Sequence, residues 1–262
     1  MKTVSVVPAA PCGPDLADSP EPRGFDPGLE ELAAQVRRGG VQRPPGPAAA
    51  AVVIDVLRAT TTLAAALAHG AAAVRTAATI AEARRLGAEL PDALLCGERH
   101  GRVIPGFHLG NSPFEYTRPR VAGKTLVFAS SNGSQALWLA QRAARIWVGA
   151  FVNVSALVAR LAAENEVVLV AAGKLGEPAI EDVACAGWIA RELRARGFTA
   201  AGPEVDLAIA LAPREAGGVR ELVEHCSHAA MLEAIGPAFV RDVEYCATLD
   251  AIGEAWTIAG PA

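Results

Sequence analysis

The chain has 262 residues, of which 52% are hydrophobic and 20% charged, enough to bury a substantial core and too apolar for long disorder. Its formal net charge is -4 and only 5% of its residues are aromatic. It therefore lacks the basic excess needed to bind nucleic acid or an anionic membrane, and the rings on which single-stranded bases stack. The five cysteines are odd in number and contain no Cys-x-x-Cys pair, which argues against a disulfide framework and a structural zinc motif.

No apolar run reaches transmembrane length, because Arg, Glu, His and Gly interrupt the alanine-rich segments, and the first eight residues lack a signal-peptide core. We therefore expect a cytoplasmic protein. We also expect a single domain over 1–262, with 1–48 as a less typical N-terminal segment that includes a Pro/Gly-rich loop over 9–27.

The apolar patterns predict strands and helices in alternation. Strands are expected over 2–8, 49–54, 72–76, 93–96, 124–129, 146–149 and 167–171, and helices over 29–36, from 59–62 to His69, over 79–88, 135–144 and 180–196, with another beginning near 153–155. Beyond Gly202 the pattern is mostly helical, over 204–212, 215–224 and 229–235, with a last strand near 256–259. This alternation predicts an α/β protein with three α/β/α layers, in which helices cover both faces of a largely parallel sheet.

Polar turns follow several of the predicted strands. They fall at 55–62, 130–134, 153–155 and 173–182, so they would lie at the carboxyl edge of the sheet, where open α/β sheets bind ligands. A longer glycine-rich and charged stretch, 96–113, follows another strand. It is either a site loop or an exposed connection with turn glycines.

Asp55 directly follows the predicted strand 49–54, which is apolar without alternation, as in a strand buried on both faces. Its carboxylate can hold a hard cation or attack a substrate, or it can simply cap the next helix. Arg58 has the bidentate geometry to grip a phosphate or sulfonate. Three successive threonines stand where a helix N-terminus favours anions, or they cap that helix only: Thr60, Thr61 and Thr62.

Two further turns carry groups suited to anions and cations. The turn at 130–134 combines hydroxyls, a carboxamide and a glycine at the start of a helix, a weak phosphate-cradle pattern contributed by Ser131, Asn132, Gly133 and Ser134. Asp182 can join Asp55 and Glu98 in an oxygen site for Mg²⁺, or stabilise its own helix N-terminus together with Glu181. Lys174 is either an anion contact or a solvated turn lysine. His225 and His228 are more typical of a helix surface than of a zinc site.

Several motifs occur together in one order. They are Val53-Ile54-Asp55-Val56-Leu57-Arg58-Ala59-Thr60-Thr61-Thr62, Gly97-Glu98-Arg99, Gly106-Phe107-His108-Leu109-Gly110-Asn111-Ser112-Pro113, Ser131-Asn132-Gly133-Ser134, Glu181-Asp182 with Cys185-Ala186-Gly187, and Asp242 with Cys246. Over about residues 50–250 this set resembles the 2-phosphosulfolactate phosphatase (ComB) family. The resemblance implies an α/β/α fold and Mg²⁺-dependent hydrolysis of 2-phosphosulfolactate to sulfolactate and phosphate, a step of coenzyme M biosynthesis.

The resemblance also implies roles for individual residues. Asp55, Glu98, Arg99 and His108 would be catalytic, and Asp55, Glu98 and Asp182 would hold the metal. The substrate would be bound by Arg58, Thr60, Thr61, Thr62, Asn111, Ser112, Ser131, Asn132, Gly133, Ser134 and Lys174. The partner would be a small anionic phosphoester, and a homodimer is compatible with this prediction.

One position departs from the family pattern. Where the family typically reads Gly-Phe-Asp, this chain has His108 after Gly106-Phe107. If an aspartate there helps to hold Mg²⁺, an imidazole would weaken that metal or favour a softer one such as Mn²⁺. The alternative function is therefore a catalytically weakened ComB-like protein that binds a small anionic ligand.

Overall fold

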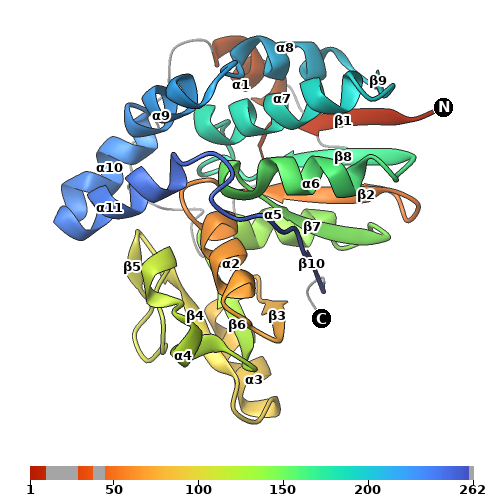
Figure 1. Ribbon diagram of the computed structural model, residues 1–262. Coiled ribbons are helices and arrows are strands. Elements are labelled where there is room, and N and C mark those ends of the chain that lie inside the picture. The colour runs from red at the N-terminus through yellow and green to blue at the C-terminus, as the bar shows by residue number, and fades with distance from the viewer. Residues whose placement is uncertain (10–28, 38–44, 260–262) are drawn as a thin grey trace.

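The structure is a computed structural model that describes residues 1–9, 29–37 and 45–259 (Figure 1). The strands of the described residues are β1 (Thr3–Val7), β2 (Ala50–Ile54), β3 (Ala73–Thr76), β4 (Leu94–Arg99), β5 (Arg102–Val103), β6 (Thr125–Ala129), β7 (Arg145–Gly149), β8 (Glu166–Ala171), β9 (Thr199–Ala200) and β10 (Thr257–Ile258). The loop predicted over 9–27 lies, apart from Ala9, outside these residues.

The helices alternate with the strands as far as α7 and then follow one another. They are α1 (Glu30–Arg37), α2 (Ala59–Ala68), α3 (Ile80–Glu89), α4 (Arg118–Val121), α5 (Gly133–Ala140), α6 (Val154–Leu161), α7 (Ile180–Arg194), α8 (Pro203–Leu211), α9 (Ala216–Glu224), α10 (Ser227–Ile235) and α11 (Pro237–Cys246), with short 3₁₀ turns at Pro113–Glu115 and Phe151–Asn153. The predicted alternation is confirmed. Thr79 caps α3, and its hydroxyl accepts the Glu82 N–H at 3.1 Å.

The strands of the described residues form two sheets where the sequence predicted one. The larger has the order β10-β7-β2-β8-β1-β9 and is parallel except for β10, and the smaller has the order β3-β6-β4-β5 and is parallel except for β5. The smaller sheet collects the strands between α2 and α5, which pair with one another. Hydrophobic periodicity indicates that a strand is buried, but it does not indicate which strand is its neighbour.

Strand β2 shows the three layers directly. All five of its side chains are buried, and they alternate between two cores. Val52 and Ile54 pack in the core that contains residues of α6 and α7, whereas Ala51 and Val53 pack in the core that contains residues of α2 and α5. The larger sheet is therefore covered on both faces, as a parallel sheet requires.

Helix α2 stands between the two sheets (Figure 1). Its residues from Ala59 to Ala66 are all buried, and Leu63 shares a core with Val53 of the larger sheet and Phe128 of the smaller one. The sequence of α2 contains no charged residue, which suits a helix with no solvent-facing side. The start of α2 therefore lies where both sheets meet. In the described residues, none of the helices combines the length and apolar character needed to cross a membrane.

Candidate active site

A cavity of ≈ 270 Å³ opens at the junction of the two sheets. Its walls come from the β2–α2 turn, the end of β4, the β6–α5 turn, the loop after β8 and helix α10. The lining residues are Asp55, Leu57, Arg58, Glu98, His100, Gly101, Asn111, Ser131, Asn132, Lys174, His228, Met231, Leu232, Ala234 and Ile235. One wall is thus rich in charged and polar groups, and α10 supplies an apolar wall opposite.

Asp55 lies at the end of β2 and is 6% exposed. Its Oδ1 accepts the N–H of Ala59, the first residue of α2, at 3.1 Å, although the N-cap residue of this helix is Arg58, and Asp55 also lines the cavity. Burial raises the pKa of the Asp55 carboxyl to about 6, the His228 charge lowers it, and the Glu98 charge adds to the increase. Gly133 packs tightly against this carboxylate, because a Cβ at position 133 would stand 2.7 Å from Asp55 Oδ2.

Glu98 connects the smaller sheet to the β6–α5 turn. Its Oε1 accepts the Ser131 N–H at 2.7 Å, and its Oε2 accepts the Gly101 N–H at 2.8 Å and the Ser131 hydroxyl at 3.2 Å. These bonds hold a buried carboxylate in one orientation at the cavity wall. Asp55 and Glu98 therefore bring two acidic groups to one cavity, and they come from different sheets where the sequence predicted one sheet edge.

Arg58 also lines the cavity, but its guanidinium is already engaged. It forms a buried ion pair with Asp242 of α11, donates from Nη2 to Gly101 O at 3.0 Å, and lies over the Phe239 ring at 4.6 Å from its centre. Asp242 in turn accepts the Ser112 hydroxyl at 2.6 Å. Arg58 thus joins α11 to the cavity, and Ser112 supports this pair from outside the lining.

The threonines after Asp55 bond to the backbone. Thr60 accepts the Asp55 N–H at 2.9 Å and reaches Gly149 O at 2.7 Å, Thr61 donates to Val56 O at 2.9 Å, and Thr62 donates to Asn111 O at 2.9 Å. All three are buried and none is among the cavity residues. Neither reading left open by the sequence describes these contacts, because the threonines do not line the cavity and do not cap α2, whose N-cap residue is Arg58.

In the turn at 130–134, some polar residues bond to the backbone and others line the cavity. The hydroxyls of Ser130 and Ser134 accept each other's backbone N–H groups, at 3.2 and 2.7 Å, which fixes the start of α5. Ser131 and Asn132 line the cavity. Two further predicted residues join them there, Lys174 and Asn111, and the buried Asn111 Oδ1 has no hydrogen-bond partner within the described residues.

Asp182 holds two strand-end loops together. Its Oδ1 accepts the Val56 N–H at 2.8 Å and its Oδ2 accepts the Gly173 N–H at 3.0 Å. Burial raises the pKa of its carboxyl well above the usual range, and the charges of Glu181 and Asp55 act in the same direction. Asp182 is not among the cavity residues, so the structure does not bring it together with the other two predicted metal ligands at the cavity wall.

His108 and Arg99 also lie away from the cavity lining. His108 is exposed, and its Nδ1 accepts the Leu95 N–H at 2.9 Å. Arg99 is half-buried and donates from Nη1 to Glu98 O at 2.9 Å. A carboxylate at position 108 would accept the same N–H, so the imidazole replaces it as a backbone acceptor. The alternative of a weakened enzyme rested on His108, and this position gives it no support.

His228 is a cavity residue that the sequence pattern assigned to a helix surface. Its Nδ1 lies 2.8 Å from Oε1 of the fully buried Glu181 on α7. Burial alone would raise the pKa of the Glu181 carboxyl, but the hydrogen bond and charge of His228 outweigh it and hold this pKa below its usual value. The spacing of His225 and His228 along the sequence could not reveal the contact between His228 and Glu181, because Glu181 lies on another helix.

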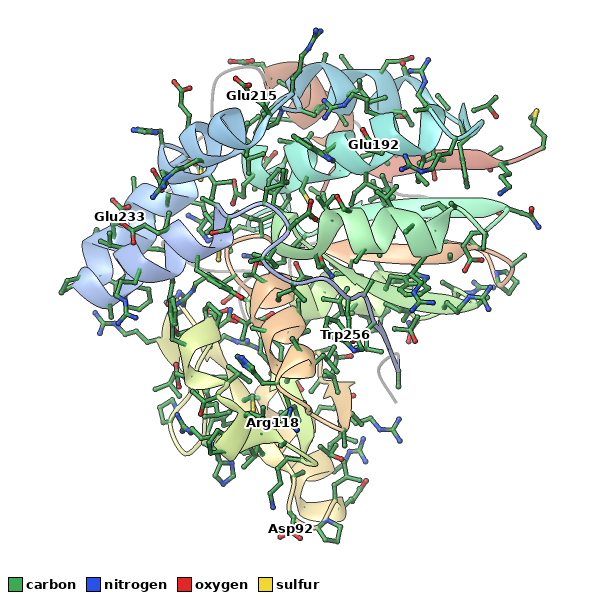
Figure 2. All side chains as sticks on the ribbon, in the orientation of Figure 1. Asp92, Arg118, Glu192, Glu215, Glu233 and Trp256 are labelled. Carbon is green, nitrogen blue, oxygen red and sulfur yellow. The ribbon has the colours of Figure 1, made fainter. Side chains whose placement is uncertain are left out.

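Within the described residues, no group of three or more His, Cys, Asp and Glu side chains has the arrangement of a metal site. Mg²⁺ binds through one or two carboxylates, and completes its shell with water and substrate oxygens. The two carboxylates at the cavity wall, Asp55 and Glu98, fit that requirement. Surface carboxylates such as Glu215 and Glu233 point outward instead (Figure 2).

These features define an α/β scaffold with a cavity at the carboxyl ends of parallel strands, lined by polar groups of the strand-end loops and by apolar side chains of α10. Residues 41–255 match the model of a family described as 2-phosphosulpholactate phosphatase. The chain belongs to this family, whose members are phosphoric monoester hydrolases, and the resemblance carried by its motifs is confirmed.

Individual relatives agree with the family match. The chain is 38% identical over 198 residues to a probable 2-phosphosulfolactate phosphatase of Thermotoga petrophila, covering 75% of this chain and 83% of the relative. It is 40% identical over 211 residues to one of Synechococcus sp. (strain JA-3-3Ab), with 79% and 87% covered. It is 40% identical over 201 residues to one of Deinococcus radiodurans, with 74% and 81% covered.

Proposed function

We propose that this protein hydrolyses 2-phosphosulfolactate to sulfolactate and phosphate in a Mg²⁺-dependent reaction. The observation that carries the proposal is the cavity wall, where the buried carboxylates of Asp55 and Glu98 stand among groups suited to a multiply charged anion. The family and its relatives, which are named as probable 2-phosphosulfolactate phosphatases, support the same substrate.

Asp55 and Glu98 would hold the Mg²⁺ ion. The bound ion supplies positive charge that offsets the phosphoryl oxygens and the charge developing on them. The repulsion between the two carboxylates, which contributes to the raised pKa of Asp55, favours a cation between them. Mn²⁺ was expected as an alternative because of His108. Since His108 does not line the cavity, we propose Mg²⁺.

The protein's own groups would bind and orient the substrate. Lys174 contributes a positive charge, Ser131 a hydroxyl, and Asn132 and Asn111 carboxamides at the cavity wall. The unpartnered Oδ1 of Asn111 fits a site completed by a ligand, since buried polar groups in proteins nearly always have a hydrogen-bond partner. Arg58 adds its charge while it stays paired with Asp242.

The test is release of inorganic phosphate from 2-phosphosulfolactate by the purified chain, with Mg²⁺ and with EDTA. Release that depends on the added metal supports the proposal. 2-Phospholactate and phosphoglycolate serve as comparison substrates that carry a carboxylate without a sulfonate. Absence of phosphate release from all three substrates with Mg²⁺ or Mn²⁺ would overturn it.

A further inference from the structure

His228 has the surroundings of a positioned imidazole. It lies in the first turn of α10, lines the cavity, and its side chain is 13% exposed. Its Nδ1 is 2.8 Å from Glu181 Oε1, and Glu181 is 0% exposed. Because Nδ1 is engaged with a carboxylate in the core, Nε2 is the ring nitrogen left for the cavity.

The cavity contains a second imidazole, and the two differ in exposure. His100 is exposed, in the turn between β4 and β5. The His228 side chain is 13% exposed, stands on a helix and contacts the buried Glu181 carboxylate, which suits a group positioned for proton transfer. It also lies close enough to Asp55 for its charge to act on that carboxyl.

Hydrolysis of an alkyl phosphate creates a demand that an imidazole can meet. When the bond between phosphorus and the ester oxygen breaks, its electron pair stays on that oxygen, and an unprotonated alkoxide is a poor leaving group. A general acid that delivers a proton at this moment typically accelerates such a step by about 10²–10⁴-fold. Metal-holding carboxylates cannot do this while they bind the cation.

We propose that His228 is the general acid of this reaction and that Glu181 is its positioning residue; this inference rests on the proposed phosphatase function. The protonated Nε2 gives its proton to the ester oxygen as the P–O bond breaks, and the product leaves as an alcohol. Water supplies the new oxygen on phosphorus, and a proton of that water restores the imidazolium. The net reaction is ester plus water to alcohol plus phosphate.

The test compares two substrates that differ in how well the alcohol leaves. 2-Phospholactate and 3,3,3-trifluoro-2-phospholactate share their phosphate and carboxylate, but the fluorines make the departing oxygen far less basic. A trifluoromethyl group is also smaller than the sulfomethyl group of the proposed substrate. Loss of a general acid should therefore lower kcat strongly for the first substrate and weakly for the second.

His228→Asn is expected to lower kcat for 2-phospholactate by about 10²–10⁴-fold, with little change in KM. For the trifluoro substrate the loss in kcat should be at least tenfold smaller. The matched control is His225→Asn, three residues away, where the imidazole is exposed and its Nδ1 lies 2.8 Å from Glu221 O. This control should keep wild-type kinetics with both substrates.

Glu181→Gln tests the positioning residue. The carboxamide keeps the size of the side chain but can no longer attract the imidazolium, so kcat should fall with the same dependence on the leaving group and by a smaller factor than in His228→Asn. Equal losses of kcat with both substrates would assign a structural role to His228 and overturn the proposal. A wild-type kcat in His228→Asn would also overturn it. A wild-type protein inactive on every substrate would instead overturn the proposed function.

Discussion

Asp55 occupies an environment that opposes its own charge. It is almost fully buried, and the nearby Glu98 carboxylate adds to the effect of burial on its pKa. Such a group destabilises the fold when it ionises, and it gains a favourable role only when a cation or a proton is present. The same residue that would bind Mg²⁺ is therefore a source of instability in the metal-free protein.

This instability predicts a pH-dependent effect of Asp55→Asn. The folded-state pKa of about 6 lies above the ordinary aspartate pKa of 3.8, so the cost of ionisation is absent below the lower pKa and fully present above the higher one. At neutral pH it is on the order of 3 kcal/mol, since each pKa unit corresponds to about 1.4 kcal/mol. In EDTA, the variant should melt at a higher temperature than wild type at neutral pH, and this advantage should disappear in acid.

The variant should also lose phosphatase activity, by at least about 10²-fold, the scale of removing one charge-stabilising group. A wild-type protein as stable as Asp55→Asn at neutral pH in EDTA would contradict the assigned environment of the carboxylate.

A substitution at Gly133 tests the position of the Asp55 carboxylate, because the two residues pack against each other. A Cβ at 133 would stand 2.7 Å from Asp55 Oδ2 and 2.8 Å from Ala59 Cβ. Gly133→Ala should therefore displace the carboxylate, lower kcat, and reduce the free energy of unfolding by about 1–3 kcal/mol, as overpacking does. Urea unfolding and phosphate release measure the two effects.

The control for this substitution is Gly217→Ala in α9, where a Cβ would meet nothing within 4 Å. It should stabilise the protein by about 0.5–1 kcal/mol because alanine loses less backbone freedom than glycine in a helix. If the two variants behave alike, the close packing of Gly133 against Asp55 is wrong.

His108→Asp restores the residue that the family pattern has at this position. The imidazole is exposed and contacts the Leu95 N–H outside the cavity, and an aspartate can accept the same hydrogen bond. We expect kcat, KM and the preference for Mg²⁺ over Mn²⁺ to stay at their wild-type values. A large gain in kcat would contradict this expectation and show that position 108 takes part in the reaction.

Some site residues could be predicted from the sequence and others could not. Asp55, Glu98 and Lys174 were predicted because polar residues after parallel strands gather at one edge, and all three line the cavity. Position along the chain does not say where a hydroxyl points, so Thr60–Thr62 were grouped with them although they bond to the backbone. His228 was missed because its partner Glu181 lies on another helix.

Helix α11 supports the site through one buried ion pair. Asp242 binds both Arg58 and the Ser112 hydroxyl, and its side chain and that of Arg58 are each 3% exposed. Removing one partner of a buried pair leaves the other charge without compensation, which typically costs about 3–5 kcal/mol. This ion pair therefore joins α11 to the cavity wall, in addition to the packing of Val243 and Cys246 in the core.

We expect Asp242→Asn to lower the free energy of unfolding by about 3 kcal/mol or more, and Arg58→Met/Asp242→Leu to recover part of that loss because neither charge remains. Chemical denaturation of wild type, Arg58→Met, Asp242→Leu and the double variant gives the coupling energy. Additive losses would show that the two side chains do not interact in the folded protein.

Among the elements, α2 shows why local structure was easier to predict than assembly. Its alanine-rich sequence without charges indicated a helix, and the helix is present at Ala59–Ala68. The same pattern does not say that two sheets cover it. Strands β3, β4 and β6 were predicted as well, but their separation into a second sheet depends on which strands pair, and this information is not contained in the periodicity of one strand.

The cavity lies between two sheets, so a ligand bound there contacts both. A ligand present at about 100 times its Kd should stabilise the protein by about 2.7 kcal/mol. With Mg²⁺ and inorganic phosphate, amide hydrogen exchange should slow in peptides covering 55–59, 97–101, 130–133, 173–176 and the start of α10. Helices α4 and α8, which contribute no cavity residue, should be unaffected. Protection confined to loops of one sheet would contradict a shared site.

The distances along the chain between the cavity residues also bear on how the molecule folds. Asp55, Glu98, Ser131, Lys174 and His228 come from five separate segments. Contacts of such long sequence separation form after local helices, because the entropy of closing long loops is lost before the contact compensates it. A refolding chain should regain its helical circular dichroism before it regains turnover. Recovered phosphate release then reports that the last wall of the cavity is in place.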